Sequence, residues 1–253
     1  MATPQRTNVL ITGASSGLGA EMARQLAGRG HDLALAARRL DRLEELRAEI
    51  VAAHPERRVL VRTMDVTDED GVFAAFRGFR EELGSLDRVV VNAGLGKGAP
   101  IGTGRHDANR ETAMTNFIGA LTQSEAAMEA FLDQGRGHFV MISSMSAMRG
   151  MPRAMTTYAA TKAGVAHLAE GLRFELQGTD IKVSVIYPGY IASEMNDGNA
   201  SGTPLMVSTE KGVRAMVDAI EKEKESACVP PLPWAPMSLV MKHAPLPVLK
   251  RLI

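Results

Sequence analysis

The stretch VLITGASSGLGAEMARQLAGRG, residues 9–30, decides the fold of this chain. It begins as a short apolar run, passes through Gly13, Gly17 and Gly19, and continues as an amphipathic segment. Glycine permits backbone conformations that other residues avoid, and a helix N-terminus presents free N–H groups at a positive dipole end. The stretch therefore predicts a strand, a tight turn and a helix that together bind a diphosphate. A plain strand-to-helix turn is the alternative interpretation.

The same alternation of apolar runs and longer amphipathic segments continues along the chain, as expected for strands joined by helices. The predicted strands are Asn8–Thr12, Asp32–Ala36, Val59–Met64, Arg88–Val91, His138–Ile142 and Lys182–Tyr187, with a seventh, edge strand at Ala227–Pro230. The predicted helices are Gly19–Arg29, Asp41–Ala53, Glu69–Leu83, Asn109–Asp133, Thr156–Gln177 and Thr209–Glu223. This order predicts one α/β domain over residues 1–253, a doubly wound parallel sheet of Rossmann type.

The composition excludes several classes of protein. Hydrophobic residues make up 45% of the 253 residues and charged residues 23%, which is ordinary for a soluble globular domain. The formal net charge is zero, so we expect no nucleic-acid partner. A single cysteine, Cys228, and no secretory signal predict a cytoplasmic protein. His106, His138 and His167 lack metal-ligand spacing, so we predict no metal.

The end of the second predicted strand indicates which dinucleotide the site takes. Many nucleotide-binding folds place an acidic residue here for the adenosine ribose, but this chain has Ala37, Arg38 and Arg39. An acid would repel a 2′-phosphate, whereas a guanidinium can bind it through paired hydrogen bonds. The sequence therefore predicts NADP(H) rather than NAD(H), unless the two arginines only solvate the start of a helix.

A second segment, MISSMSAMRGMPRAMTTYAATK at residues 141–162, carries groups suited to proton transfer. Tyr158 and Lys162 lie one helical turn apart on the same face, and a nearby ammonium favours the phenolate. Ser144 follows a predicted strand, where its hydroxyl can hydrogen-bond a substrate oxygen. These three groups suit proton transfer to an oxygen while a hydride moves at the adjacent carbon. An ordinary surface pair is the alternative for Tyr158 and Lys162.

Taken together, these motifs resemble the short-chain dehydrogenase/reductase family from Thr7 to Ser193. The resemblance is carried by the glycine motif Thr12–Gly19, Asp65–Val66, Asn92–Gly94, Asn116, Ser144, Tyr158 with Lys162, and Pro188–Gly189. It implies a catalytic set of Asn116, Ser144, Tyr158 and Lys162, in which Asn116 binds a water that relays protons from Lys162. Lys162 also binds the cofactor ribose.

The resemblance also implies where the cofactor lies. Asp65 and Val66 would hold the adenine, Asn92 to Gly94 would line the cleft, and Ile191 and Ser193 would touch the carboxamide. The implied cofactor-binding residues are Gly13, Ser15, Ser16, Gly17, Leu18, Gly19, Arg38, Arg39, Asp65, Val66, Asn92, Ala93, Gly94, Tyr158, Lys162, Pro188, Gly189, Ile191 and Ser193.

Two departures from the family pattern bear on the site. Val91 stands where the family often has a first asparagine. The interval from Ser144 to Tyr158 is fourteen residues, one longer than expected, which leaves Ser143, Ser144 and Ser146 as candidates for the hydroxyl. Ser144 ranks first because Ser143 would point to the opposite side of the strand.

Several features bear on the substrate and the partners. Methionines crowd the interval before Tyr158 and can shape a pocket for an apolar substrate, although plain packing is the alternative: Met145, Met148, Met151 and Met155. Residues 226–253 form a basic, apolar, proline-rich tail without acids, for which we expect a lid or subunit contact in preference to a membrane surface. Small residues beside Tyr158 predict a homo-dimer or homo-tetramer: Ala159, Ala163, Gly164 and Ala166.

The main hypothesis is an NADP(H)-dependent oxidoreductase acting on a carbonyl/alcohol pair. The alternatives are an NADP-dependent epimerase and a nucleotide-sensing protein without turnover. An intact set of Asn116, Ser144, Tyr158 and Lys162 argues against the sensing protein.

Overall fold

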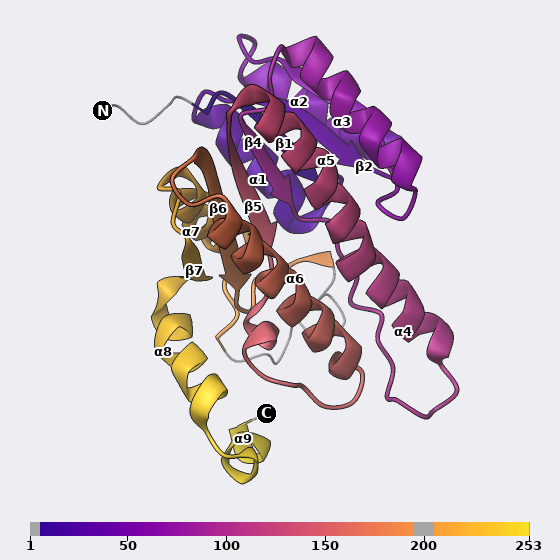
Figure 1. Cartoon of the computed structure of the whole chain (residues 1–253), viewed down its shortest axis with the longest axis vertical. Helices are drawn as coiled ribbons and strands as arrows, with labels where there is room; N and C mark the ends of the chain where they lie inside the picture. Colours follow the sequence, from indigo (N-terminus) through magenta and orange to yellow (C-terminus); the bar gives the residue numbers. More distant parts are fainter. Residues whose placement is uncertain (1–5, 195–204, 253) are drawn as a thin grey trace.

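One parallel sheet forms the centre of the chain (Figure 1). The computed structural model describes residues 6–194 and 205–252, and within them the sheet has seven strands in the order β3-β2-β1-β4-β5-β6-β7. The strands are β1 Asn8–Thr12, β2 Asp32–Ala37, β3 Val59–Thr63, β4 Arg88–Val91, β5 Arg136–Ile142, β6 Asp180–Pro188 and β7 Ser226–Val229. The predicted doubly wound Rossmann-type sheet, with its edge strand near residue 227, is therefore confirmed.

Helices cover both faces of this sheet (Figure 1). α1, α2 and α7 pack on one face, and α3, α5 and α6 pack on the other. Their bounds are α1 Gly17–Gly28, α2 Leu40–Ala53, α3 Glu69–Leu83, α4 His106–Ala113, η1 Met114–Ile118, α5 Gly119–Gln134, η2 Met145–Met148, α6 Met155–Glu175, α7 Thr209–Glu221, α8 Pro231–His243 and α9 Leu246–Leu252. None of the described helices is long and apolar enough to cross a bilayer.

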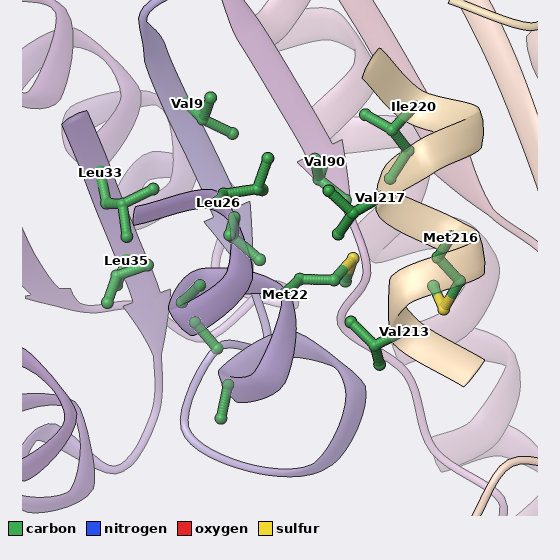
Figure 2. Close-up of a cluster of buried hydrophobic side chains, with 14 of the residues drawn as sticks. Val9, Met22, Leu26, Leu33, Leu35, Val90, Val213, Met216, Val217 and Ile220 are labelled. Atoms are coloured by element: carbon green, nitrogen blue, oxygen red, sulfur yellow. The ribbon is translucent and has the colours of Figure 1, made fainter. Parts of the chain in front are cut away.

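The alternation of side chains along each strand divides the core into two layers. In β1, Val9 and Ile11 join the layer under α1, α2 and α7, whereas Leu10 joins the layer under α3, α5 and α6. Figure 2 shows the first layer, where Met22 and Leu26 of α1 approach the side chains of α7. Because both faces are buried, the strands are continuous apolar runs, which made them easy to predict.

The structure differs from the predicted elements mainly at the starts of β5 and β6, in the helix before β5 and in the tail, and β6 begins at Asp180 rather than Lys182. β5 begins at Arg136, two residues before the predicted start, because Arg136 pairs with Asp180 of β6. The single helix predicted over Asn109–Asp133 is instead α4, one π-helical turn at η1, and α5. The predicted tail contributes β7 to the sheet and then continues as α8 and α9.

A buried polar network lies at the amino-terminal edge of the sheet, opposite the edge that carries the glycine turn. Arg88 Nε donates a hydrogen bond of 2.8 Å to His138 Nδ1, and His138 Nε2 lies 2.8 Å from the Ser184 hydroxyl. His138 therefore accepts at one nitrogen, which requires the neutral ring. Burial, helped by the charges of Arg88 and Arg6, lowers the pKa of His138 well below its ordinary value.

This neutral histidine predicts a loss of stability in acid. An unfolded His titrates near about 6.5, so the contribution of neutral His138 is complete above that pH and is lost as the pH falls toward its folded pKa. The free energy of unfolding should fall by up to about 1.4 kcal/mol per pH unit below about pH 6.5, and His138→Asn should remove this part of the slope. Urea unfolding between pH 5 and 7.5 measures it. The control is His167→Asn, an exposed position on α6, and equal slopes in both variants would contradict the prediction.

Candidate active site

The carboxyl ends of four neighbouring strands bring the predicted site residues to one edge of the sheet. β1 ends at Thr12, β4 at Val91, β5 at Ile142 and β6 at Pro188, and these four strands are consecutive in the sheet. The glycine turn, Asn92, Ser144 and Gly189 each follow directly from one of these ends. In open α/β sheets, ligands bind in the crevice outside these carboxyl ends.

The glycine turn between β1 and α1 has no room for larger residues. Gly13 has a φ of +64°, and a Cβ on it would lie 2.8 Å from the Ala93 Cα. A Cβ on Gly19 would lie 2.3 Å from the Gly13 carbonyl oxygen. The turn therefore delivers the chain into α1 with Gly17, Leu18 and Gly19 in its first turn. The N–H groups of a first helical turn lack partners within the helix and suit phosphate oxygens.

Asn92 holds this turn in place through its amide. Its Nδ2 donates to the Thr12 carbonyl at 3.0 Å and lies 3.4 Å from the Gly13 carbonyl. The Thr12 hydroxyl accepts from the backbone N–H groups of Asn92 and Ala93, at 3.1 and 3.2 Å. The side chain of Asn92 thus fastens β4 to the glycine turn, and only the backbone from Asn92 to Gly94 faces the predicted cleft.

Basic residues gather beside the turn at the end of β2. Arg39 donates to the hydroxyls of Ser15 and Ser16, at 3.2 and 2.7 Å. Arg38 is exposed on the side of Asp65. The Thr67 backbone N–H, with smaller contributions from the Thr67 hydroxyl and the Arg38 charge, lowers the pKa of Asp65. Val66 is buried against Gly119.

Two crossing hydrogen bonds join the end of β5 to α6. The Ser143 hydroxyl donates to the Lys162 carbonyl at 2.7 Å, and Lys162 Nζ donates to the Ile142 carbonyl at 2.9 Å. Ser144 hydrogen-bonds Tyr158, and its hydroxyl also accepts from Ser146. Of the three candidate serines, Ser144 is the one directed at the tyrosine, since Ser143 is occupied with the backbone of α6.

Burial dominates the electrostatics of Tyr158 and Lys162. Lys162 Nζ lies 5.9 Å from the centre of the Tyr158 ring. Burial raises the pKa of Tyr158, and the hydrogen bond with Ser144 acts in the opposite direction. Burial also lowers the pKa of Lys162 to about 8. Burial therefore outweighs the effect of the ammonium on Tyr158 in this arrangement, because the same burial disfavours both charges.

Asn116 is almost fully buried and lies beside the tyrosine and lysine helix. Its carboxamide pairs with the backbone of Leu95, accepting at 2.6 Å and donating at 2.8 Å, and lies 3.3 Å from the Thr161 hydroxyl. A Cβ on Gly94 would lie 3.3 Å from Asn116 Oδ1 and 3.4 Å from Lys162 Nζ. Asn116 and Lys162 therefore border the same small space next to Gly94.

The segment after β6 runs across the opening of the cleft. A Cβ on Gly189 would lie within 2.4 Å of the Trp234 ring, and Tyr190 meets that ring edge-on at 5.4 Å. Ser193 lies next to Gly17, with 3.5 Å between its Cβ and the position of a Cβ on Gly17. The side chain of Ile191 is buried in the core against Gly212 and does not face the cleft, so only its backbone can meet a carboxamide.

An apolar cluster of methionines adjoins Ser144. It connects η2 to α8, so the tail packs beside the predicted reaction centre (Figure 1). Met155 is not part of this cluster, because it begins α6 and is exposed. The cluster contains Met145, Trp234 and Met241, with Met148, Met151, Tyr187, Cys228 and Met237 packed against it.

A family model described as short chain dehydrogenase matches residues 7–203, which span the glycine turn, Ser144, Tyr158 and Lys162. The chain belongs to the short-chain dehydrogenases. This short-chain dehydrogenase is 50% identical over 236 residues to an uncharacterized oxidoreductase of Mycobacterium tuberculosis, covering 93% of each chain. It is thus an oxidoreductase of this family.

Solved structures similar to this short-chain dehydrogenase hold either nicotinamide dinucleotide. A variant of actinorhodin polyketide ketoreductase solved with NADPH is 26% identical, with a TM-score of 0.76 over 87% of this chain and 92% of that one. A short-chain dehydrogenase/reductase from Burkholderia phymatum in complex with NAD has a TM-score of 0.84 over 100% of this chain and 97% of that one. At 19% identity, the second likeness shows the fold alone.

Sequence reasoning missed four residues that the structure places at the site. Thr12 could have been found, because it precedes Gly13 in the quoted motif. Glu194, which contacts both Arg39 and Arg42, gave no local signal, and neither did Arg42. Trp234 was noted only as part of the apolar tail. Among the described residues there is no group of three potential metal ligands.

Proposed function

We propose that this short-chain dehydrogenase interconverts a carbonyl and an alcohol on an apolar small molecule, with NADP(H) as cofactor. The observation that carries the proposal is the placement of Ser144, Tyr158 and Lys162 together where β5 meets α6, at the sheet edge that holds the glycine turn. That turn packs so tightly that no Cβ fits at Gly13 or Gly19, and it leads directly into the N-terminus of α1, whose free N–H groups can bind a diphosphate. The cofactor, when bound, supplies or accepts a hydride.

Tyr158 transfers the proton in this proposal. Because burial raises its pKa, the phenol is protonated at neutral pH and can donate to a carbonyl oxygen as negative charge develops there. Ser144 donates a second hydrogen bond to the same oxygen and orients it. Lys162, with a pKa of about 8, is largely charged at neutral pH, stabilises the phenolate left after transfer and binds the cofactor ribose. Asn116 closes the small space next to Gly94 in which a relay water would lie.

The substrate is apolar because the wall beside Ser144 consists of thioethers and Trp234. Flexible methionine side chains adapt to large apolar ligands. NADPH oxidation measured over ketones and aldehydes of graded chain length tests this, and kcat/KM should rise with apolar length. An unchanged or falling kcat/KM would contradict an apolar substrate. Product analysis separates reduction from epimerisation, and tight NADPH binding without turnover of any compound would favour the nucleotide-sensing alternative.

The preference for NADP(H) rests on Arg38 and Arg39. Arg39 is already hydrogen-bonded to Ser15 and Ser16 at the turn, which supports the proposal that its guanidinium binds the 2′-phosphate. The single cysteine supports a reducing, cytoplasmic location.

Arg39→Ala should weaken NADPH binding by about ten- to a hundredfold, because one charge-assisted hydrogen-bonding group is lost. NADH binding should change little, since NADH has no 2′-phosphate. Fluorescence titration of both cofactors measures the ratio, with Arg58→Ala, an exposed arginine before β3, as the control. Wild-type protein that binds and uses NADH as well as NADPH would contradict the assignment.

We also propose that the protein forms a homo-oligomer, but through different residues from those expected from the sequence. Ala159 and Ala166 are buried within the chain, and Gly164 packs against the Phe117 ring, so these residues are not free to meet a second copy. Large apolar side chains are instead exposed on α5 and α6: Leu132 at 62% and Phe174 at 69%. We propose that these outer faces pair between copies.

Phe174→Glu should convert the oligomer to a smaller species or a monomer at micromolar concentration, because the charge would be buried in the contact. Light scattering measures the mass. Val51→Glu, an exposed apolar position on α2, is the control and should leave the mass unchanged. A monomeric wild-type protein would overturn the proposal.

A further inference from the structure

One carboxylate lies across two arginines beside the glycine turn. Glu194 accepts from Arg42 at 2.7 Å and lies 3.5 Å from Arg39. Arg39 also donates to the hydroxyls of Ser15 and Ser16. The five side chains thus form a cationic corner in which Arg39 and Arg42 share a single anion.

This corner is a long-range contact and not a local pairing along one helix. Glu194 follows β6, whereas Arg42 lies in the first turn of α2, 152 residues earlier. Other arginines of the same helix pair locally, as Arg47 does with Glu44. The hydrogen bond from Arg42 lowers the pKa of Glu194, so the carboxylate is ionised near neutral pH. The neighbouring Ser193 lies next to Gly17, which brings this segment to the glycine turn.

The arrangement matches what a phosphate monoester would require. Two guanidinium groups meet one carboxylate, and one of them, Arg39, also donates to two serine hydroxyls. Guanidinium groups bind phosphate and carboxylate through the same forked geometry. All three charged side chains are 43–49% exposed, so a soluble ligand can replace the carboxylate. Exposed ion pairs are weak, each about 0.2–1 kcal/mol, so the replacement is not prohibitive.

We propose that Arg42 is a further ligand of the cofactor 2′-phosphate and that Glu194 is an internal anion competing with that phosphate for Arg39 and Arg42. The inference rests on the proposed use of NADP(H). A cofactor with the 2′-phosphate must displace Glu194, whereas NADH presents only a hydroxyl there and has no anion to place between the arginines. Glu194 therefore reduces the discrimination between the two cofactors, and Arg42 increases it.

The test compares the affinities of NADPH, NADH and adenosine 2′,5′-bisphosphate in variants of the full chain. Glu194→Gln should increase the affinity for NADPH and for the bisphosphate by about three- to tenfold, while the affinity for NADH should change less than about twofold. Arg42→Ala should weaken NADPH and the bisphosphate by about three- to tenfold, again without effect on NADH. In the double variant, the gain from Glu194→Gln should shrink, because one of its two partners is gone.

Matched controls are Arg47→Ala on the same helix and Glu210→Gln, an exposed carboxylate that pairs with Arg214. Both should leave all three affinities unchanged. If Glu194→Gln leaves the ratio of the NADPH and NADH affinities unchanged, the proposed competition is overturned. Wild-type preference for NADH would overturn the proposed cofactor, but the competition is judged separately, from the change that each variant makes in the NADPH to NADH ratio.

Discussion

Tyr158→Phe should lower kcat by about 10²- to 10⁴-fold, the range that a positioned general acid contributes. The phenol hydrogen-bonds Ser144 and its raised pKa keeps the proton available, so no other group at this position can supply it. Because the ring remains, NADPH affinity should stay within about twofold of wild type. Steady-state kinetics and fluorescence titration on the same preparation measure the two effects.

Tyr187→Phe is the matched control, since it removes a hydroxyl from another half-buried tyrosine, at the end of β6. Its kcat should remain near the wild-type value. A Tyr158→Phe enzyme with wild-type kcat would exclude Tyr158 as the proton donor and, with it, the proposed mechanism. A loss of NADPH binding comparable to the loss of kcat would instead indicate a role in holding the cofactor.

Lys162→Met should abolish most turnover and weaken NADPH binding while making the fold more stable. Burial lowers the pKa of Lys162 from 10.5 to about 8, which corresponds to a cost of up to about 3 kcal/mol for keeping the charge at pH 7. The folded state binds fewer protons than the unfolded state between pH 8 and 10.5, so this cost is complete below about pH 8 and disappears as the pH rises through that window. Methionine fills the same space without charge.

Thermal and urea unfolding of wild type and Lys162→Met at pH 7 and at pH 9.5 measure the gain in stability of the variant. This gain should be larger at pH 7. Lys182→Met, at an exposed position on β6, is the control and should change neither stability nor activity strongly. A variant that loses stability would mean that the hydrogen bond to the Ile142 carbonyl outweighs the burial of charge. A variant with normal kcat would exclude Lys162 from the reaction.

The sheet was predictable because its strands are buried on both faces and therefore read as apolar runs. Val9, Leu10 and Ile11 illustrate this, since consecutive residues enter opposite core layers and none can be polar. The start of β5 was predicted two residues late because its first residue is not buried. Arg136 is exposed and joins the sheet through its backbone, and the hydrophobic pattern carries no information on such residues.

The candidate site was predictable where spacing along one element decides the geometry. Tyr158 and Lys162 share a face of α6 because four residues make about one helical turn. Properties that depend on distant segments were not predictable. The pKa of Tyr158 follows from how deeply the helix is buried, the carboxamide of Asn116 pairs with Leu95 across a loop, and Glu194 reaches Arg42 from the far end of the chain.

The single π-helical turn at η1 has a consequence for how this site can change in evolution. A π turn holds one residue more than an α turn, so η1 is the equivalent of a one-residue insertion within an otherwise continuous helix. Deleting any one residue of Met114–Ile118 would restore a regular α-helix and remove the extra residue that this turn accommodates. Either Asn116 would turn away from Leu95 or the buried face of α5 would turn away from the sheet. Length variation among relatives should therefore be absent from these five residues and concentrated in the loop that precedes α4.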